Sequence, residues 1–229
     1  MTDASTTRRS ELAPAPDTTS RTRTLLACGV AAGPLYIVVG LLQALTRDGF
    51  DLSRHALSLL ANGDLGWIQI ANFAVTGVLT IAGARGMRRA LRTGRGRTWG
   101  PLLLGVYGAS LIAAGFLVAD PALGFPPGTP PGQPATVTWH GIGHFVAGGI
   151  GFLALIASCL VFSRRFAALG DRGWAVFSAA TGILFLAGFA GIAGGNQHPA
   201  LNIAFGVAVV LAWAWVSALS ARLRSESPR

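Results

Sequence analysis

The chain has 229 residues, of which 52% are hydrophobic and 12% are charged. A water-soluble domain carries about 25% charged residues, so this composition excludes an ordinary soluble globule. The formal net charge of +9 comes from 18 basic residues that are all Arg, and such a charge alone would be compatible with nucleic-acid binding.

Six apolar stretches run without Asp, Glu or Arg. Each is about 20 residues long, the length of a helix that crosses a hydrocarbon core of about 30 Å. A soluble bundle would carry charged residues on its outer faces at every turn, and these stretches carry none. The sequence therefore predicts an all-α fold, a polytopic transmembrane bundle of six helices: Leu25–Leu45, Leu65–Ala84, Gly100–Ala119, Ile142–Phe162, Trp174–Gly194 and Ala200–Ser220.

Arg residues alternate between the connecting segments. Sixteen of the 18 lie in the two terminal tails and in the second and fourth loops, and only Arg47 and Arg54 lie in an odd-numbered loop. Because Arg gathers on the cytoplasmic side of membrane proteins, both termini are predicted to be cytoplasmic. The predicted location of the protein is the plasma membrane. This distribution makes the charge a topology signal and argues against nucleic acid as a partner. The lipid bilayer is the predicted partner.

The domain organisation follows from the same pattern. Residues 1–24 are predicted to form a disordered cytoplasmic tail, residues 25–220 the transmembrane domain, and residues 221–229 a second cytoplasmic tail. The spacings Gly29-x-x-x-Gly33 and Gly191-x-x-x-Gly195 predict close helix crossings within the bundle rather than a dimer interface. A homo-oligomer stays possible but is not indicated.

Four sequence motifs occur in a fixed order, in or beside the predicted first and third loops. They are FDLSRHALSLL at 50–60, GWIQIANF at 66–73, DPALGFP at 120–126 and WHGIGH at 139–144. Together they resemble the DUF998 family of bacterial membrane proteins. The resemblance implies a six-helix integral membrane protein, and no catalytic residues can be carried over from it.

Polar residues gather at the predicted extracytoplasmic side. The spacing of Gln69, Asn72 and Thr76 places them in one stripe on the second helix, and such a stripe faces protein or water rather than lipid. All four histidines lie in or beside odd-numbered loops. The sequence predicts a pocket for a small ligand or lipid head group that includes Gln69, Asn72, His55 and His198.

His140 and His144 have the i, i+4 spacing that lets two imidazoles on one helix face hold one metal ion. Asp120, or His55, would supply a third ligand, and three such ligands with an open position suit a catalytic zinc. We expect these four residues to converge on one pocket. The alternatives are a hydrogen-bonded structural pair or a pH sensor for the histidines, and a turn residue that caps a helix end for Asp120.

Two loop segments are also predicted. Residues 52–60 are expected to form a short helix on the membrane surface, capped by Ser53 or Asp51. The proline-rich segment 126–134 is expected to cover the outer mouth of the bundle.

Three functions fit these features. The first is a non-catalytic membrane protein whose outer polar cluster binds a small ligand or lipid head group. The second is a metal-dependent hydrolase, with zinc as its cofactor, acting on a lipid or lipid-linked substrate. The third is a transporter, although no Asp, Glu, Arg or His lies near the middle of any predicted helix. The sequence does not decide whether the protein is an enzyme.

Overall fold

The structure is a computed structural model, and it describes residues 18–194 and 198–227. Over these residues it is all-α without strands, which confirms the predicted fold class. Six of its helices are long and apolar enough to cross a membrane. The elements are α1 (Thr18–Thr46), the 3₁₀ helix η1 (Leu57–Ala61), α2 (Gly66–Ala90), α3 (Trp99–Phe116), α4 (Trp139–Ala168), α5 (Arg172–Ala193) and α6 (Pro199–Glu226).

Several helices extend beyond the apolar stretches that predicted them. The first begins at Thr18 and the last ends at Glu226, so residues 18–24 and 221–226, predicted as tails, are helical. The remainder of both predicted tails lies outside the described residues, apart from Ser227. Hydropathy falls where Arg and Ser begin, but neither Pro nor Gly interrupts the backbone there, so the helical hydrogen bonds continue into the interface.

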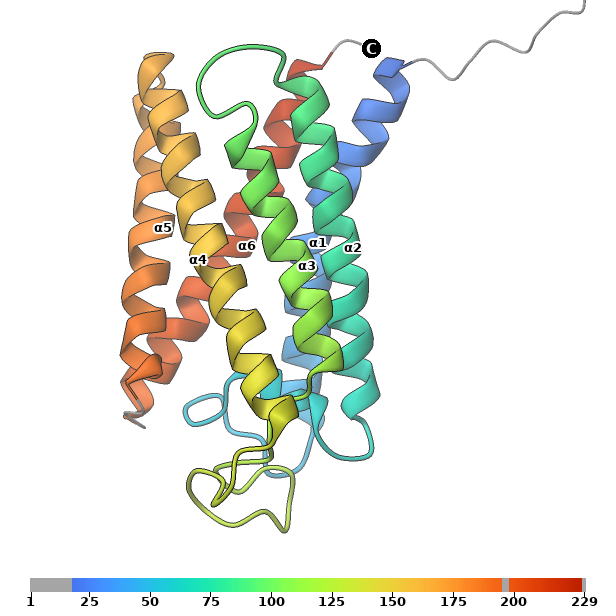
Figure 1. Cartoon of the computed structure of the whole chain (residues 1–229), viewed down its shortest axis with the longest axis vertical. Helices are drawn as coiled ribbons and strands as arrows, with labels where there is room; N and C mark the ends of the chain where they lie inside the picture. The colour runs from blue at the N-terminus through green and yellow to red at the C-terminus, as the bar shows by residue number, and fades with distance from the viewer. Residues whose placement is uncertain (1–17, 195–197, 228–229) are drawn as a thin grey trace, which may run out of the picture.

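The six helices form a ring. Each packs against its neighbours in chain order, and α6 closes the ring by packing on α1. The two described ends of the chain lie at one end of the bundle, and the long loops 47–65 and 117–138 lie at the other (Figure 1). We call these the terminal end and the loop end. Residues 91–98 and 169–171 connect helices at the terminal end.

Glycines set the close approach of α1 to its two neighbours in the ring. A Cβ at Gly83 of α2 would lie 2.7 Å from the Cα of Gly29. A Cβ at Gly33 would lie 2.7 Å from the carbonyl oxygen of Trp213 in α6 and would also contact the hydroxyl of Ser217. The Gly29 and Gly33 pair therefore packs within the bundle, as predicted. Gly191 packs on α6, and Gly195 lies outside the described residues.

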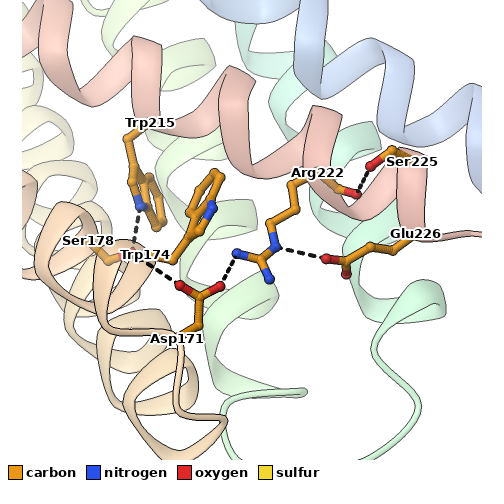
Figure 2. A network of polar contacts seen from close by, with 7 residues as sticks. All are labelled: Asp171, Trp174, Ser178, Trp215, Arg222, Ser225 and Glu226. Carbon is orange, nitrogen blue, oxygen red and sulfur yellow. Dashed lines mark hydrogen bonds and ion pairs between the residues drawn. The ribbon is translucent and has the colours of Figure 1, made fainter.

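An arginine fastens α5 to α6 at the terminal end (Figure 2). The Arg222 guanidinium lies 2.6 Å from the carboxylate of Asp171 and 2.8 Å from that of Glu226. It also lies over the rings of Phe166 and Trp174, at 4.7 and 5.0 Å from their centroids. Asp171 caps α5 by accepting from the Trp174 N–H. The pKa of Asp171 is lowered mainly by the hydrogen bond from Arg222, and to a smaller extent by this capping bond.

One interhelical hydrogen bond lies deeper in the same seam. The indole Nε1–H of Trp215 in α6 donates to the hydroxyl of Ser178 in α5 at 2.9 Å, and both side chains are buried. The indole N–H of Trp213 has no partner in the part of the chain that the structure describes. Trp215 therefore contributes a directed link between α5 and α6, whereas Trp213 contributes only ring packing.

Candidate functional site

The polar stripe of α2 forms a buried ladder against α1. Gln43 donates to the Oε1 of Gln69 at 2.8 Å, and Asn72 donates to the same atom and to the carbonyl of Tyr36. Thr76 donates to the Oδ1 of Asn72. The stripe thus faces protein, as predicted. Within residues 18–194 and 198–227, the Oε1 of Gln43 and the Nε2 of Gln69 have no hydrogen-bond partner.

His55 joins the two long loops. Its Nδ1 accepts the Asp51 N–H at 2.9 Å, so its Nε2 carries the proton that it donates to the carbonyl of Leu123 at 3.1 Å. Leu123 has a φ of 58°, which turns the backbone sharply at this contact. The imidazole is 2% exposed and packs against Phe50 and Phe125. Both ring nitrogens of His55 are thus used within the protein.

Arg47 reinforces this cap. Its guanidinium donates to the carbonyls of Leu60 and Asn62 and lies 4.9 Å from the ring centroid of Phe125. It therefore holds η1 over the loop end of the helix ring, between α1 and the loop 117–138.

The helix predicted over 52–60 is shorter and more buried than expected. A turn occupies residues 52–54, η1 covers only Leu57–Ala61, and the residue before it, Ala56, makes no side-chain cap. Asp51 accepts instead from the N–H of Ser53, outside η1. The side chains of Leu59 and Leu60 are buried in a small core with Phe125, so burial in the cap, rather than the membrane surface, positions this segment.

Asp120 caps the N-terminus of α4. Its two carboxylate oxygens accept from the backbone N–H and the hydroxyl of Thr138, at 2.9 and 2.6 Å. Thr138 in turn accepts from the Gly141 N–H, and a Cβ at Gly141 would collide with the Asp120 carboxylate. A negative charge here meets the positive end of the α4 dipole. This is the capping role that the sequence left open as an alternative.

The two histidines of α4 have different surroundings. The Nδ1 of His144 lies 2.9 Å from the carbonyl oxygens of Ala114 and Leu117, so this nitrogen carries the proton and caps the C-terminal turn of α3. His140 is exposed, and its ring centroid lies 3.6 Å from that of Trp139. Only His144 takes part in packing between helices.

The structure does not assemble the predicted zinc ligands. Among the described residues, no three His, Cys, Asp or Glu side chains form a group that could hold a metal ion. The carboxylate of Asp120 is used at Thr138, the Nδ1 of His144 at α3, and both nitrogens of His55 between the loops. His140 lies against the Trp139 ring, and each of the other three candidate ligands has a separate hydrogen-bond partner, so the described residues do not form a shared metal site.

The predicted ligand pocket is also dispersed. Gln69 and Asn72 belong to the ladder between α1 and α2, and His55 belongs to the loop cap. His198 is exposed and caps α6 by accepting from the Ala200 N–H at 3.2 Å. None of the four side chains lines the cavity that the loop half of the bundle contains.

That cavity has a volume of about 540 Å³, in the range of small-molecule sites. All six helices line it, and Ala56, Leu57 and Ser58 around the start of η1, with Gln133 of the loop 117–138, complete its wall. It therefore lies inside the helix ring and reaches the loop end. It spans His144 to Phe152 along α4, a rise of about 12 Å.

Two buried tyrosines line the cavity. Tyr36 of α1 and Tyr107 of α3 are 7% and 4% exposed, and both rings pack against Trp213, Tyr36 stacked at a centroid distance of 5.0 Å and Tyr107 tilted at 5.5 Å. In the described part of the chain, neither hydroxyl has a hydrogen-bond partner, and the same holds for the hydroxyl of Ser110. None of these oxygens is among the fully buried atoms that lack a partner, so they reach the open space of the cavity, where they can donate to or accept from a polar occupant.

Aromatic rings and missing side chains shape the rest of the wall. Phe152 packs edge-on against Phe189 and Phe205, with ring centroids 5.1 and 5.7 Å away. On α4, a Cβ at Gly148 or Gly149 would meet no other atom within 4 Å. The glycine run of α4 thus leaves open space beside an apolar wall. It was the one sequence signal that could have pointed to this cavity.

A family model described as "Protein of unknown function (DUF998)" matches residues 30–222. No curated protein and no solved structure matches the chain.

Proposed function

Since this chain belongs to the DUF998 family, whose description assigns no activity, we propose from its own geometry that it is a non-catalytic membrane protein that binds a lipid or another amphipathic small molecule in the cavity of its loop half. The observation that carries the proposal is the pair of tyrosine hydroxyls that have no partner among the described residues and reach the open space of that cavity.

The chemistry of the wall fits a ligand with an apolar body and one polar group. Phe152, Phe189 and Phe205 offer an apolar surface, whereas the hydroxyls of Tyr36 and Tyr107 offer donors and acceptors. The second ring nitrogen of His144 adds an acceptor, because Nδ1 holds the proton. Within the described ranges no three metal-ligating side chains come together, and the apolar wall with its few polar groups supports binding of an amphipathic ligand.

We place the terminal end in the cytoplasm of a cell whose plasma membrane holds the protein, because the Arg residues concentrate at that end. The cavity then faces the extracytoplasmic side. A reporter fused after Arg229 should be active only in the cytoplasm, and activity only outside the cell would overturn this orientation.

The cavity is tested by filling it. Gly148→Leu places a side chain in open space within the cavity, and Gly206→Leu is the matched control, because Gly206 also has open space around its Cβ position but does not line the cavity. With a fluorescent single-chain lipid as the probe and protein in mild detergent, Gly148→Leu should weaken binding at least tenfold. Gly206→Leu should bind like the parent. Equal affinity of all three proteins would refute the cavity as the binding site.

The hydroxyls are tested separately. Tyr36→Phe with Tyr107→Phe removes two oxygen atoms and keeps the rings that pack on Trp213. A net hydrogen bond contributes about 0.5–1.5 kcal/mol, so the loss of two predicts a decrease in affinity of about 5- to 150-fold. A comparison of His144→Asn with His144→Gln separates the packing of α4 on α3 from ligand binding. The Asn amide can still donate to α3 from the position of Nδ1, so His144→Asn should preserve stability and lower the affinity for the ligand.

A further inference from the structure

A second cavity, at the terminal end, differs in character from the first. Its volume is about 660 Å³, and it lies between α1, α2, α4 and α6. Four arginines line it, whereas Glu226 is the only acidic residue of its wall in the part of the chain that the structure describes. Its lining residues are Thr19, Arg21, Thr22, Arg89, Ala90, Leu91, Arg92, Arg165, Leu223, Glu226 and Ser227.

The acidic residue does not neutralise these arginines. The carboxylate of Glu226 is 2.8 Å from Arg222, which does not line the cavity. Over residues 18–194 and 198–227, the guanidinium groups of Arg21, Arg89 and Arg92 form neither a hydrogen bond nor an ion pair. Three exposed cations, Arg21 of α1, Arg89 of α2 and Arg92 of the α2–α3 loop, thus line one cavity without a paired countercharge among the described residues.

Arg165 differs because the protein fixes its position. Its Nη1 donates at 2.9 Å to the carbonyls of Thr93 and Arg95 in the α2–α3 loop. Gly94, with a φ of 86°, lets this loop turn around the guanidinium. The remaining N–H groups of Arg165 stay available, so one donor of the cavity is already oriented before any ligand binds.

Arginines at helix C-termini also balance the helix dipole, so the charge of the dipoles at this end has to be compared with the charge of the arginines. Each helix end carries about half an elementary charge, and the C-termini of α2, α4 and α6 all lie at this end. Together with Glu226 they offset about two and a half positive charges, whereas the N-terminus of α1 adds about one half. A net charge of about +2 remains in the cavity, which dipole balance leaves unexplained.

We propose that this cavity binds a phosphate-bearing anion, with Arg21, Arg89 and Arg92 as its ligands and Arg165 as the prealigned donor at its rim. Guanidinium groups recognise phosphate through paired N–H···O bonds, and basic pockets between helix ends at the membrane surface suit lipid phosphates. The same chemistry can be supplied by the head group of an anionic phospholipid or by a soluble phosphate compound. The proposal does not depend on the cavity at the loop end.

The test uses the full chain in nanodiscs of phosphatidylcholine with and without phosphatidylglycerol, and native mass spectrometry to count retained lipids. The variant Arg21→Gln/Arg89→Gln/Arg92→Gln removes the three unpaired charges. The matched control Arg85→Gln/Arg88→Gln/Arg164→Gln removes three charges from the same end, and none of these residues lines the cavity. A second arm adds pyrophosphate to protein in neutral detergent and measures its dissociation constant by calorimetry.

We expect the parent to retain phosphatidylglycerol at least tenfold over phosphatidylcholine, the cavity variant to lose this preference, and the control to keep it. Pyrophosphate binding that the cavity variant loses, without a lipid preference, would identify a soluble phosphate as the source. The proposal is overturned if the parent shows neither the preference for phosphatidylglycerol nor pyrophosphate binding, or if both triple variants lose binding equally. If the cavity variant does not fold, Arg92→Gln alone against Arg88→Gln gives the same comparison, with a smaller expected loss of about threefold.

Discussion

The crossing of α1 and α6 makes a quantitative prediction for Gly33→Ala. The new methyl group would lie 2.7 Å from the carbonyl oxygen of Trp213, whereas an unstrained contact needs about 3.4 Å. Ser217 can rotate its hydroxyl away, but a helical carbonyl cannot. The two helices must therefore separate locally by about 0.7 Å.

Overpacking of this kind costs about 1–3 kcal/mol in the free energy of unfolding. Alanine also favours a helix over glycine by up to about 1 kcal/mol, and this gain would hide part of the loss. Gly206→Ala is the control that carries the same gain, because no atom lies within 4 Å of its Cβ position. The difference between the two variants isolates the cost of the crossing.

The assay is unfolding in mixed micelles with increasing dodecyl sulfate, followed by tryptophan fluorescence. Gly33→Ala should be less stable than Gly206→Ala by about 1–3 kcal/mol. Adding Ser217→Gly should recover only part of the loss, since the Trp213 carbonyl remains. Equal stability of Gly33→Ala and Gly206→Ala would refute the close crossing, and full recovery by Ser217→Gly would show that the carbonyl contact is absent.

Two further predictions concern the ends of the bundle. Because the pKa of Asp171 is lowered on folding, the carboxylate stabilises the protein above the unfolded pKa of about 3.9, and this stabilisation is lost as the pH falls through the lower folded pKa. Asp171→Asn should therefore lower the melting temperature at pH 7 and flatten the decline of the melting temperature below about pH 4. Parallel pH profiles of the melting temperature for both proteins would exclude the ion pair with Arg222. At the loop end, the Asn202 amide donates to two carbonyls of the loop 47–65, at 2.8 and 3.1 Å. Asn202→Leu should raise amide hydrogen exchange in that loop and leave exchange in α2 unchanged. Unaltered exchange in the loop would contradict the role of these two hydrogen bonds.

The fold could be predicted because the membrane leaves few alternatives. A run of about 20 apolar residues without charge can satisfy its backbone in lipid only as a helix, so the six stretches located all six helices. The i, i+3, i+7 spacing of Gln69, Asn72 and Thr76 likewise placed them on one buried face. These are local properties of the chain. They do not depend on which helices become neighbours.

The grouping of site residues could not be predicted, because the side of the membrane says little about distance within it. Asp120, His140 and His144 all lie at the loop end, yet a backbone N–H or carbonyl within reach of each side chain, or an adjacent ring, decides its position. The cavity of the loop half is defined by residues that read as ordinary core, such as Tyr36 and Tyr107. Their missing partners become visible only when all six helices are in place.

The closure of the ring by α6 has a consequence for biosynthesis. The polar ladder needs only α1 and α2, so it can form as soon as the first hairpin has entered the membrane. The face of α1 that carries Gly33 must wait for the last helix to leave the ribosome, because its partner in the finished ring is α6. A nascent chain of five helices therefore presents an open glycine-lined groove to the lipid or the insertion machinery, and synthesis of the C-terminus is the event that removes it.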